Sequence, residues 1–297
     1  MKFRNYLLLI LGTFSLVNLS CSSGGSDGQV LISGGSSSVE IAERIISLSP
    51  TATEILFAIE AGGQVVAVDD QSNFPLEAPM TPLSGYTPNI ESIAEYQPDL
   101  VVASYDPGDL VGGLEALEVA TLLQPAASSM EDTYVQINEL GLLTGRQSEA
   151  SELIESIKSD LDEIASKKIG KGLTYYHEID NTLYSPTSKT FLGKLYSLLG
   201  LSNIADPAIE GGFGWPQLSA EFIIDADPDL IFLGNTDWGE SVEIVAERPG
   251  WGSLTAVEKG RVISVDTDTS GRWGPRVVDF LISVRSAIEK ILASELR

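Results

Sequence analysis

The amino-acid sequence predicts an α/β protein of two similar lobes with mostly parallel sheets, joined by one long connector helix, with a ligand cleft between the lobes. Three observations predict this fold class. Short β-branched runs alternate with segments of helical periodicity. The segment 147–168 keeps helical periodicity throughout and contains neither Gly nor Pro. A short sequence pattern occurs twice, once on each side of that segment.

The chain begins with the features of an export signal. Lys2 and Arg4 supply positive charge, and residues 6–19 are almost wholly apolar. This apolar stretch is too short to span a bilayer, which needs ~20 such residues. A basic start, a short apolar stretch and then small residues are the pattern of a secretory signal. The alternative, a buried first helix, is disfavoured because the Ser- and Gly-rich residues 22–26 cannot continue a core.

Cys21 is the only cysteine, so its thiol cannot form an internal disulfide. Residues 17–21 resemble a bacterial lipoprotein processing site, in which the cysteine is lipidated, although Asn18 stands where leucine is usual. The alternative is an incidental thiol in a plain secretory signal. We expect a signal peptide over residues 1–21, a Gly/Ser-rich tether over 22–43, and an exported lipoprotein anchored in a membrane and facing the periplasm or cell surface.

Composition narrows the class of partner. The 297 residues are 43% hydrophobic and carry a formal net charge of −24. The hydrophobic fraction is that of an ordinary globular protein. So acidic a surface argues against nucleic acid or anionic lipid as a partner.

Past the tether, strands and helices are expected to alternate. Near-continuous apolar strands separated by helices are typical of a parallel sheet covered on both faces. Strands are predicted at 44–48, 64–68, 99–103, 173–177, 229–233 and 261–265, and helices near 51–61, 90–96, 191–199, 220–226 and 275–296.

The long amphipathic segment divides the chain. Its apolar residues follow i, i+3/i+4, i+7 spacing, which predicts one helix with a single buried face. We therefore expect an N-terminal lobe over 44–146, the connector helix over 147–169 and a C-terminal lobe over 170–297.

An internal repeat supports the similarity of the lobes. Residues 91–101 match residues 221–231, with Glu, Ile and Pro-Asp-Leu at the same offsets, and the copies lie 221 − 91 = 130 residues apart. Each copy is read as a short helix, a Pro-Asp turn and a buried strand. Two similar lobes imply a cleft between them, where small-molecule sites are preferentially found.

Five segments, in order along the chain, resemble the solute-binding proteins of cobalamin and iron-siderophore ABC importers, and the cobalamin-binding branch is the closer match. The segments are 44–58 (RIISLSPTATEILFA), 89–93 (NIESI), 98–102 (PDLVV), 215–221 (WPQLSAE) and 272–276 (RWGPR). The resemblance implies two lobes joined by one long helix, with the ligand in the cleft. It also implies that Glu91 and Glu221 pair with arginines on the transporter's membrane subunits. The alternative is that each glutamate is only favoured by the dipole of the helix it begins.

Several residues match the family's ligand-facing loops. Aromatic walls with a few placed polar groups suit a large, partly flat ligand such as a corrin ring, and core packing is their alternative role. The candidate ligand-binding residues are Tyr86, Tyr105, His177, Trp215, Trp238, Asp268, Arg272 and Trp273.

The charges of these loops help to separate the ligand classes. A ferric catecholate is strongly anionic and favours several Arg or Lys side chains. The loops offer Arg272, with Arg276 and Lys189 as further candidates, against five aspartates: Asp69, Asp70, Asp106, Asp237 and Asp268. These charges favour cobalamin or a neutral to cationic ferric hydroxamate. The resemblance to the cobalamin-binding branch implies a corrinoid as the ligand, with a ferric hydroxamate siderophore or haem as alternatives.

His177 is the only histidine. Capture of bare zinc or manganese favours several imidazole and carboxylate ligands together, so no metal site of the protein's own and no cofactor are expected. One hypothesis places His177 next to the metal of a bound corrinoid or haem. The competing interpretation is a hydrogen-bonded histidine at the end of a strand.

The sequence does not predict an enzyme. It contains no Gly-x-Ser-x-Gly, His-Glu-x-x-His, Gly-x-x-x-x-Gly-Lys-Ser/Thr or Gly-x-Gly-x-x-Gly pattern. A cleft-bearing α/β hydrolase is a remote alternative. The expected partners are a small metal chelate and the permease and ATPase subunits of an importer, with the protein acting as a monomer. A surface lipoprotein that presents its ligand to another receptor would not depend on Glu91 and Glu221.

Overall fold

The computed structural model describes residues 40–208 and 214–295. The predicted signal peptide, Cys21 and most of the predicted tether lie outside these residues. Within them, no helix is long and apolar enough to cross a membrane.

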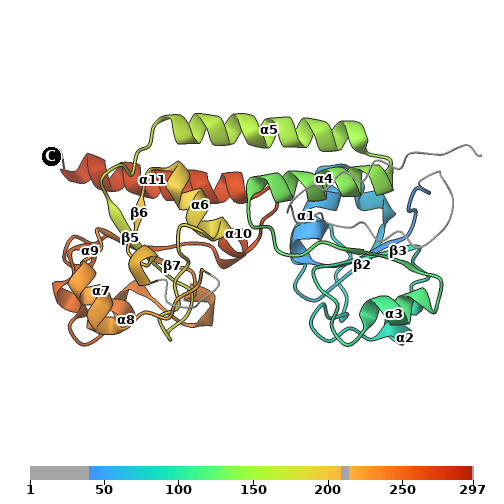
Figure 1. Ribbon diagram of the computed structural model, residues 1–297, viewed down its shortest axis with the longest axis horizontal. Helices are drawn as coiled ribbons and strands as arrows, with labels where there is room; N and C mark the ends of the chain where they lie inside the picture. Colours follow the sequence, from blue (N-terminus) through green and yellow to red (C-terminus); the bar gives the residue numbers. More distant parts are fainter. Residues whose placement is uncertain (1–39, 209–213, 296–297) are drawn as a thin grey trace, which may run out of the picture. The chain divides into compact units, whose positions relative to one another are not determined.

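Two parallel sheets with the same strand order organise the described chain (Figure 1). The first has the order β2-β1-β3-β4 and the second β6-β5-β7-β8, and every pair of neighbours is parallel. The strands are β1 Ile45–Leu48, β2 Val65–Val68, β3 Leu100–Ala103, β4 Ala120–Leu123, β5 Thr174–Glu178, β6 Ser202–Asn203, β7 Leu230–Leu233 and β8 Val262–Ser264. The predicted α/β class with two similar, mostly parallel sheets is therefore confirmed.

Helices connect the strands of each sheet. The central strands β1, β3 and β7 are buried along their whole length, as apolar strands covered on both faces should be. The helices of the first half are α1 Pro50–Ala58, α2 Ile90–Ala94, α3 Leu110–Glu115 and α4 Met130–Thr144. Those of the second half are α6 Phe191–Leu198, α7 Ala220–Ala226, α8 Val242–Glu247, α9 Thr255–Glu258, α10 Thr267–Gly271 and α11 Val277–Glu295.

The long helix α5, Gln147–Ser166, joins the two halves. Its buried residues Ala150, Ile154, Ile157, Leu161 and Ile164 recur at helical spacing and form the face predicted from the sequence. This face packs against α4 of the first half and against α6 and α11 of the second (Figure 1). The helix is therefore built into the cores of both halves.

The internal repeat has a structural counterpart in strand register. Ile45 pairs with Leu100 in the first sheet and Tyr175 pairs with Leu230 in the second, so both partners shift by the same 130 residues. The repeated Pro-Asp-Leu therefore begins the strand that lies beside the first strand of each sheet.

Two strands, β4 and β6, and five helices, α3, α4, α8, α9 and α10, were not predicted from the sequence. β4 is an edge strand that is mostly exposed, so it lacks the continuous apolar run of the central strands. β6 has only two residues, which is too short for any periodic signal.

Candidate ligand-binding site

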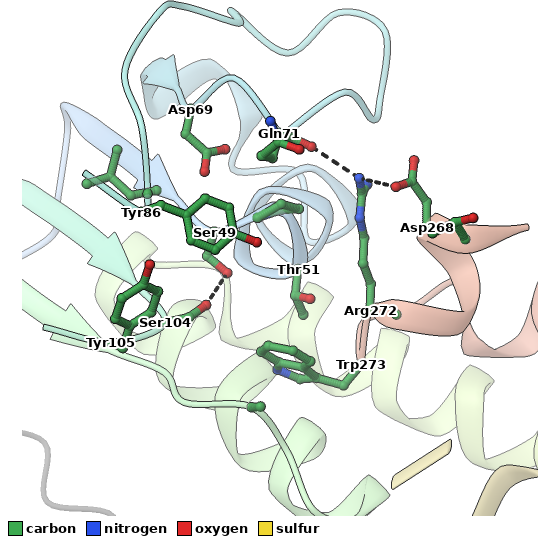
Figure 2. A pocket seen from close by; sticks show the side chains of 16 residues that line it. Ser49, Thr51, Asp69, Gln71, Tyr86, Ser104, Tyr105, Asp268, Arg272 and Trp273 are labelled. Atoms are coloured by element: carbon green, nitrogen blue, oxygen red, sulfur yellow. Dashed lines mark hydrogen bonds and ion pairs between the residues drawn. The ribbon is translucent and has the colours of Figure 1, made fainter. Parts of the chain in front are cut away.

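A cavity of about 510 Å³ lies at the carboxyl ends of the strands of the first sheet (Figure 2). Ser49 directly follows β1, Asp69 follows β2 and Ser104 follows β3. Parallel strands bring their carboxyl ends to one edge of the sheet, which is where ligands bind in open α/β sheets. The cavity is also lined by Thr51, Gln71, Gly85, Tyr86, Tyr105, Thr267, Asp268, Arg272 and Trp273.

Five of the residues predicted to contact ligand meet in this cavity. They are Tyr86, Tyr105, Asp268, Arg272 and Trp273. The Tyr86 and Tyr105 rings lie 6.3 Å apart, centroid to centroid, with an angle of 50° between their planes. Both side chains are exposed, at 69% and 44% of their surfaces, so they offer aromatic faces to a bound molecule instead of filling the core.

Arg272 reaches from the second half of the chain to the first. Its Nη1 donates to Oε1 of Glu54 at 2.8 Å. Its Nη2 donates to Oδ1 of Asp268 at 2.7 Å and to the carbonyl of Gln71 at 3.1 Å (Figure 2). The same Nη2 also donates to Oδ1 of Asn73 at 2.8 Å. The guanidinium is therefore already surrounded by acceptors of the protein itself.

Glu54 is the anchor for two arginines. This α1 carboxylate is 3% exposed, and its Oε1 also accepts from Nη2 of Arg276 at 2.6 Å. The Arg276 guanidinium lies 4.2 Å from the centroid of the Phe74 ring. A buried carboxylate needs such compensation, because an unpaired charge inside a protein is strongly destabilising. The segment that carries both arginines is thus fixed to the first half of the chain.

Two hydrogen bonds, one from the indole and one to the backbone carbonyl, fix the position of Trp273. Its Nε1 donates to Oε1 of Gln136 at 2.8 Å, and its carbonyl accepts from Oγ1 of Thr133 at 2.9 Å. Both partners belong to α4, a helix that the sequence analysis did not identify. These bonds satisfy the indole N–H and orient the ring at the cavity wall.

Hydroxyl groups line the floor of the cavity. Oγ of Ser104 donates to Oγ of Ser49 at 2.9 Å (Figure 2), and Oγ of Ser49 also caps α1 through the N–H of Ala52. Next to them, Oγ of Ser72 donates to Oδ1 of Asp69 at 2.5 Å. Burial raises the pKa of Asp69 above that of an ordinary aspartate, with the neighbouring charge of Asp70 adding to the effect.

The structure places His177 away from this cavity, which corrects the expectation that it faces the cleft. His177 lies in β5 and is 1% exposed, with its Nδ1 2.8 Å from the hydroxyl oxygen of Tyr196. Burial lowers the pKa of His177 to about 3, so the imidazole is neutral. It is a hydrogen-bonded core histidine at the end of a strand, the competing interpretation given above.

Two predicted aromatic residues lie outside the cavity. Trp215 is 41% exposed and Trp238 is 70% exposed, and neither lines it. Lys189 does not line it either, nor do Asp70, Asp106 and Asp237. Of the loop charges considered from the sequence, the cavity keeps only Asp69, Asp268 and Arg272.

Four lining residues were not predicted from the sequence: Ser49, Thr51, Gln71 and Ser104. A signal for them exists, because each lies within three residues of the carboxyl end of a buried strand. In the described part of the chain, no group of three or more His, Cys, Asp or Glu side chains is arranged to hold a metal ion.

The two repeated glutamates occupy the same position of two equivalent helices. Glu91 is the second residue of α2, which is capped by the Asn89 side chain at 2.9 Å from the N–H of Ser92. Glu221 is the second residue of α7, which is capped by Ser219. Both side chains are exposed, and neither forms an ion pair with another described residue. They are therefore free to bind an external cation.

Comparison with known proteins agrees with this architecture. The family model described as "Periplasmic binding protein" matches residues 45–269. The chain is 30% identical to the uncharacterized ABC transporter substrate-binding lipoprotein YvrC of Bacillus subtilis, over 80% of this chain and 77% of that protein. It is 26% identical to a cobalamin-binding protein of Halobacterium salinarum, over 82% of this chain and 69% of that protein.

The structure is also similar to a solved structure, that of a possible iron-binding (periplasmic solute-binding) protein of Staphylococcus epidermidis. The two structures superpose with a TM-score of 0.72 and 27% sequence identity, over 84% of this chain and 99% of the other. The family match covers most of the chain and includes both sheets and the connecting helix. It also includes five of the predicted site residues: Tyr86, Tyr105 and Asp268, which line the cavity, and the repeated Glu91 and Glu221. On these grounds the chain belongs to the periplasmic binding protein family, the solute-binding components of transport systems.

Proposed function

We propose that this protein is the substrate-binding component of an ABC importer, and that it captures a corrinoid and delivers it to a membrane permease. The observation that carries the ligand assignment is the composition of the cavity. Two exposed tyrosines and one indole surround it, and the one arginine of its lining is already bound by four acceptors of the protein. Such a wall suits a broad, flat ligand with little negative charge.

The relatives support the same assignment. The similar protein of Halobacterium salinarum is named as cobalamin-binding. A ferric hydroxamate is the second candidate, favoured by the possible iron-binding function of the Staphylococcus epidermidis protein and by the lack of an available cation in the cavity lining. Haem fits this cavity less well, because its two carboxylates would need cationic partners.

A thermal-shift panel tests the ligand assignment. The probes are cyanocobalamin, cobinamide, haem and the ferric hydroxamate ferrioxamine B. A ligand at a hundredfold excess over its Kd stabilises the protein by about 2.7 kcal/mol, so a corrinoid should raise the melting temperature and haem should not. A shift with ferrioxamine B alone would replace the corrinoid by the second candidate.

Delivery is proposed to depend on Glu91 and Glu221. Charge-assisted bonds from a guanidinium to a carboxylate are strong and directional, and a permease of two similar subunits would meet two equivalent carboxylates. Exchanging both glutamates for lysine should abolish uptake while ligand affinity stays unchanged. The matched control exchanges Glu155 and Glu163, exposed glutamates on α5, for lysine with the same change in net charge. Equal uptake by the two double variants would refute the docking proposal.

The anchor is proposed to be a lipid on Cys21. Growth with labelled palmitate should label the wild-type protein, and exchange of Cys21 for serine should remove the label and release the protein from the membrane fraction. Membrane retention of the Cys21→Ser variant would contradict the anchor.

A further inference from the structure

Asp69 is a buried carboxylate without a cationic partner. It is 2% exposed, yet it lines the cavity and its side chain points toward it (Figure 2). Among the described residues, no Lys or Arg forms an ion pair with it. Its Oδ1 accepts a hydrogen bond from the hydroxyl of Ser72, and the backbone N–H groups of Ser72 and Gln71 also bond to the carboxylate. All of these donors are neutral. Burying a charge in this way is costly unless something pairs with it, so the position calls for an external partner.

The backbone leaves room for this carboxylate at the wall of the cavity. A Cβ atom placed on Gly85 would come within 2.8 Å of Oδ2 of Asp69 and 2.7 Å of the carbonyl oxygen of Leu48. Any side chain at position 85 would therefore displace Oδ2. Glycine here keeps Oδ2 in place beside the cavity.

The remaining charges of the lining do not offset Asp69. Asp268 is a second carboxylate, and its Oδ1 and Oδ2 are bound by Arg272 and Asn73. Arg272 in turn is shared between Asp268 and Glu54. The aromatic groups, Tyr86, Tyr105 and Trp273, are neutral. The cavity thus presents to a ligand one carboxylate that has neutral hydrogen-bond donors but no cationic partner, at Asp69.

We propose that Asp69 is a specificity-determining residue of this site, which accepts hydrogen bonds from amide or ammonium groups on the rim of the ligand and excludes ligands that present a carboxylate there. This inference rests on the proposed function, because it assumes that the cavity holds a metal chelate. Beyond that function, the inference specifies the chemical class of the chelate, which is neutral or cationic and has N–H donors at its periphery. A ligand donor would also offset the cost of burial that raises the pKa of Asp69.

The test compares two corrinoids, one with amide and one with carboxylate side chains. The side chains of cobinamide end in amides, one of which bears an aminopropanol group, and those of cobyrinic acid end in carboxylates. Wild-type protein should prefer cobinamide by on the order of a hundredfold, because like charges repel strongly in a site of low polarity. Asp69→Asn keeps the shape and an acceptor for Ser72, and it should narrow this preference by about tenfold, which is about 1.4 kcal/mol.

Asp70→Asn is the matched control. Asp70 is the next residue, is exposed and does not line the cavity, so its exchange removes the same charge from the same loop. The preference for cobinamide should survive in this variant. An unchanged preference in Asp69→Asn, or an equal loss in both variants, would overturn the role of Asp69.

A second ligand pair separates this inference from the corrinoid assignment. If neither corrinoid binds, the corrinoid proposal fails, and Asp69 is then tested on ferrioxamine B, which has a free ammonium group, and on its N-succinyl derivative, which has a carboxylate. The preference for the ammonium form should fall by about tenfold in Asp69→Asn. An unchanged ratio there, or no binding of any of the four ligands, would overturn the inference.

Discussion

Glu178 shows how the second half of the chain holds a buried charge. This residue ends β5 and is fully buried. Its Oε2 and Oε1 accept from Nη1 and Nη2 of Arg248 at 2.6 and 2.7 Å, and Oε1 also accepts from Nδ2 of Asn235 at 2.9 Å. The Arg248 guanidinium lies 4.6 Å from the centroid of the Trp251 ring. The pair is therefore fixed in two-point geometry, the arrangement in which a buried ion pair is tolerated.

Exchange of Arg248 for alanine should strongly destabilise the folded protein. Arg248→Ala leaves the Glu178 carboxylate buried without a cation, so we expect a loss of about 3–5 kcal/mol in the free energy of unfolding. Arg285→Ala is the control, because Arg285 is 3.9 Å from the half-exposed Glu289 and should cost only about 0–1 kcal/mol. Urea denaturation measures both values, and similar losses in the two variants would contradict the argument.

His177 should make the protein sensitive to acid. Its pKa is lowered to about 3 by burial in the folded protein, whereas an exposed histidine has a pKa of about 6.5. Below pH 6.5 the His177 imidazole therefore binds a proton in the unfolded chain but not in the folded protein. The free energy of unfolding consequently falls as pH falls toward 3. Between pH 6 and 4 the wild type should lose about 1.4 kcal/mol per pH unit more than His177→Gln. Parallel stability profiles in urea denaturation would contradict this.

The site could be predicted from sequence only in part. Five residues were identified because they stand close to recognisable sequence motifs: Tyr86, Tyr105, Asp268, Arg272 and Trp273. His177 was misplaced because sequence alone does not show which end of a strand is covered. In the structure a Cβ on Gly234 would lie 2.7 Å from Nε2 of His177, so β7 and the loop after it close over the ring.

At the scale of elements, the repeated aspartate has a definite role. The Asp99 carboxylate, just before β3, accepts from the backbone N–H groups of Glu43 and Arg44 at the entry to β1. Asp229, just before β7, accepts from the N–H of Thr174 at the start of β5 at 2.9 Å. In each sheet the aspartate thus ties together the starts of the two central strands, which explains why the Pro-Asp-Leu pattern occurs twice.

Loss of this link should weaken each sheet. Asp99→Ala and Asp229→Ala should each lower the free energy of unfolding by about 1–3 kcal/mol, because backbone donors lose a charged acceptor. The corresponding Asn variants should lose less, since the amide oxygen still accepts. Asp225→Ala, at an exposed position of α7, serves as control and should change stability by less than about 0.5 kcal/mol. Thermal unfolding followed by circular dichroism would decide, and an Ala loss no greater than the control would contradict the role.

Elements with a strong period were predictable. The central strands and α5 were identified close to their observed bounds, because continuous burial or a long amphipathic face leaves a clear pattern in the sequence. The helix α4 was missed, although Ser129 and Asp132 form a capping box at its start. This capping box is a local signal that could have located the helix.

At the scale of the whole molecule, the two halves share one hydrophobic cluster. It contains Ile45 and Leu56 of the first half, Ile157 of α5, and Tyr175 and Phe280 of the second half. Two smaller clusters lie on the other sides of the sheets, one in each half. The largest core of the described chain is therefore continuous through the connecting helix.

This shared core predicts cooperative unfolding. All four tryptophans, from Trp215 onward, follow α5 in the sequence, but Trp273 is bonded to α4 of the first half. In a Trp273→Phe variant the fluorescence of the other three therefore reports on the second half, whereas circular dichroism reports on both. The two urea transitions should coincide, as they do when a chain unfolds in one step. Two separated transitions would show that the halves unfold independently and would contradict the role assigned to α5.

The sequence by itself determined the α/β class, the duplication and the connecting helix. Each of these follows from residue spacing, because periodicity of burial and a repeated turn motif are written along the chain. Only the tertiary structure decided which charges meet. Glu54 and Arg272 are 218 positions apart in sequence yet 2.8 Å apart in space, and Asp69 is left without such a partner. Burial and pairing of charge depend on distances between segments, and no local pattern of residues encodes those distances.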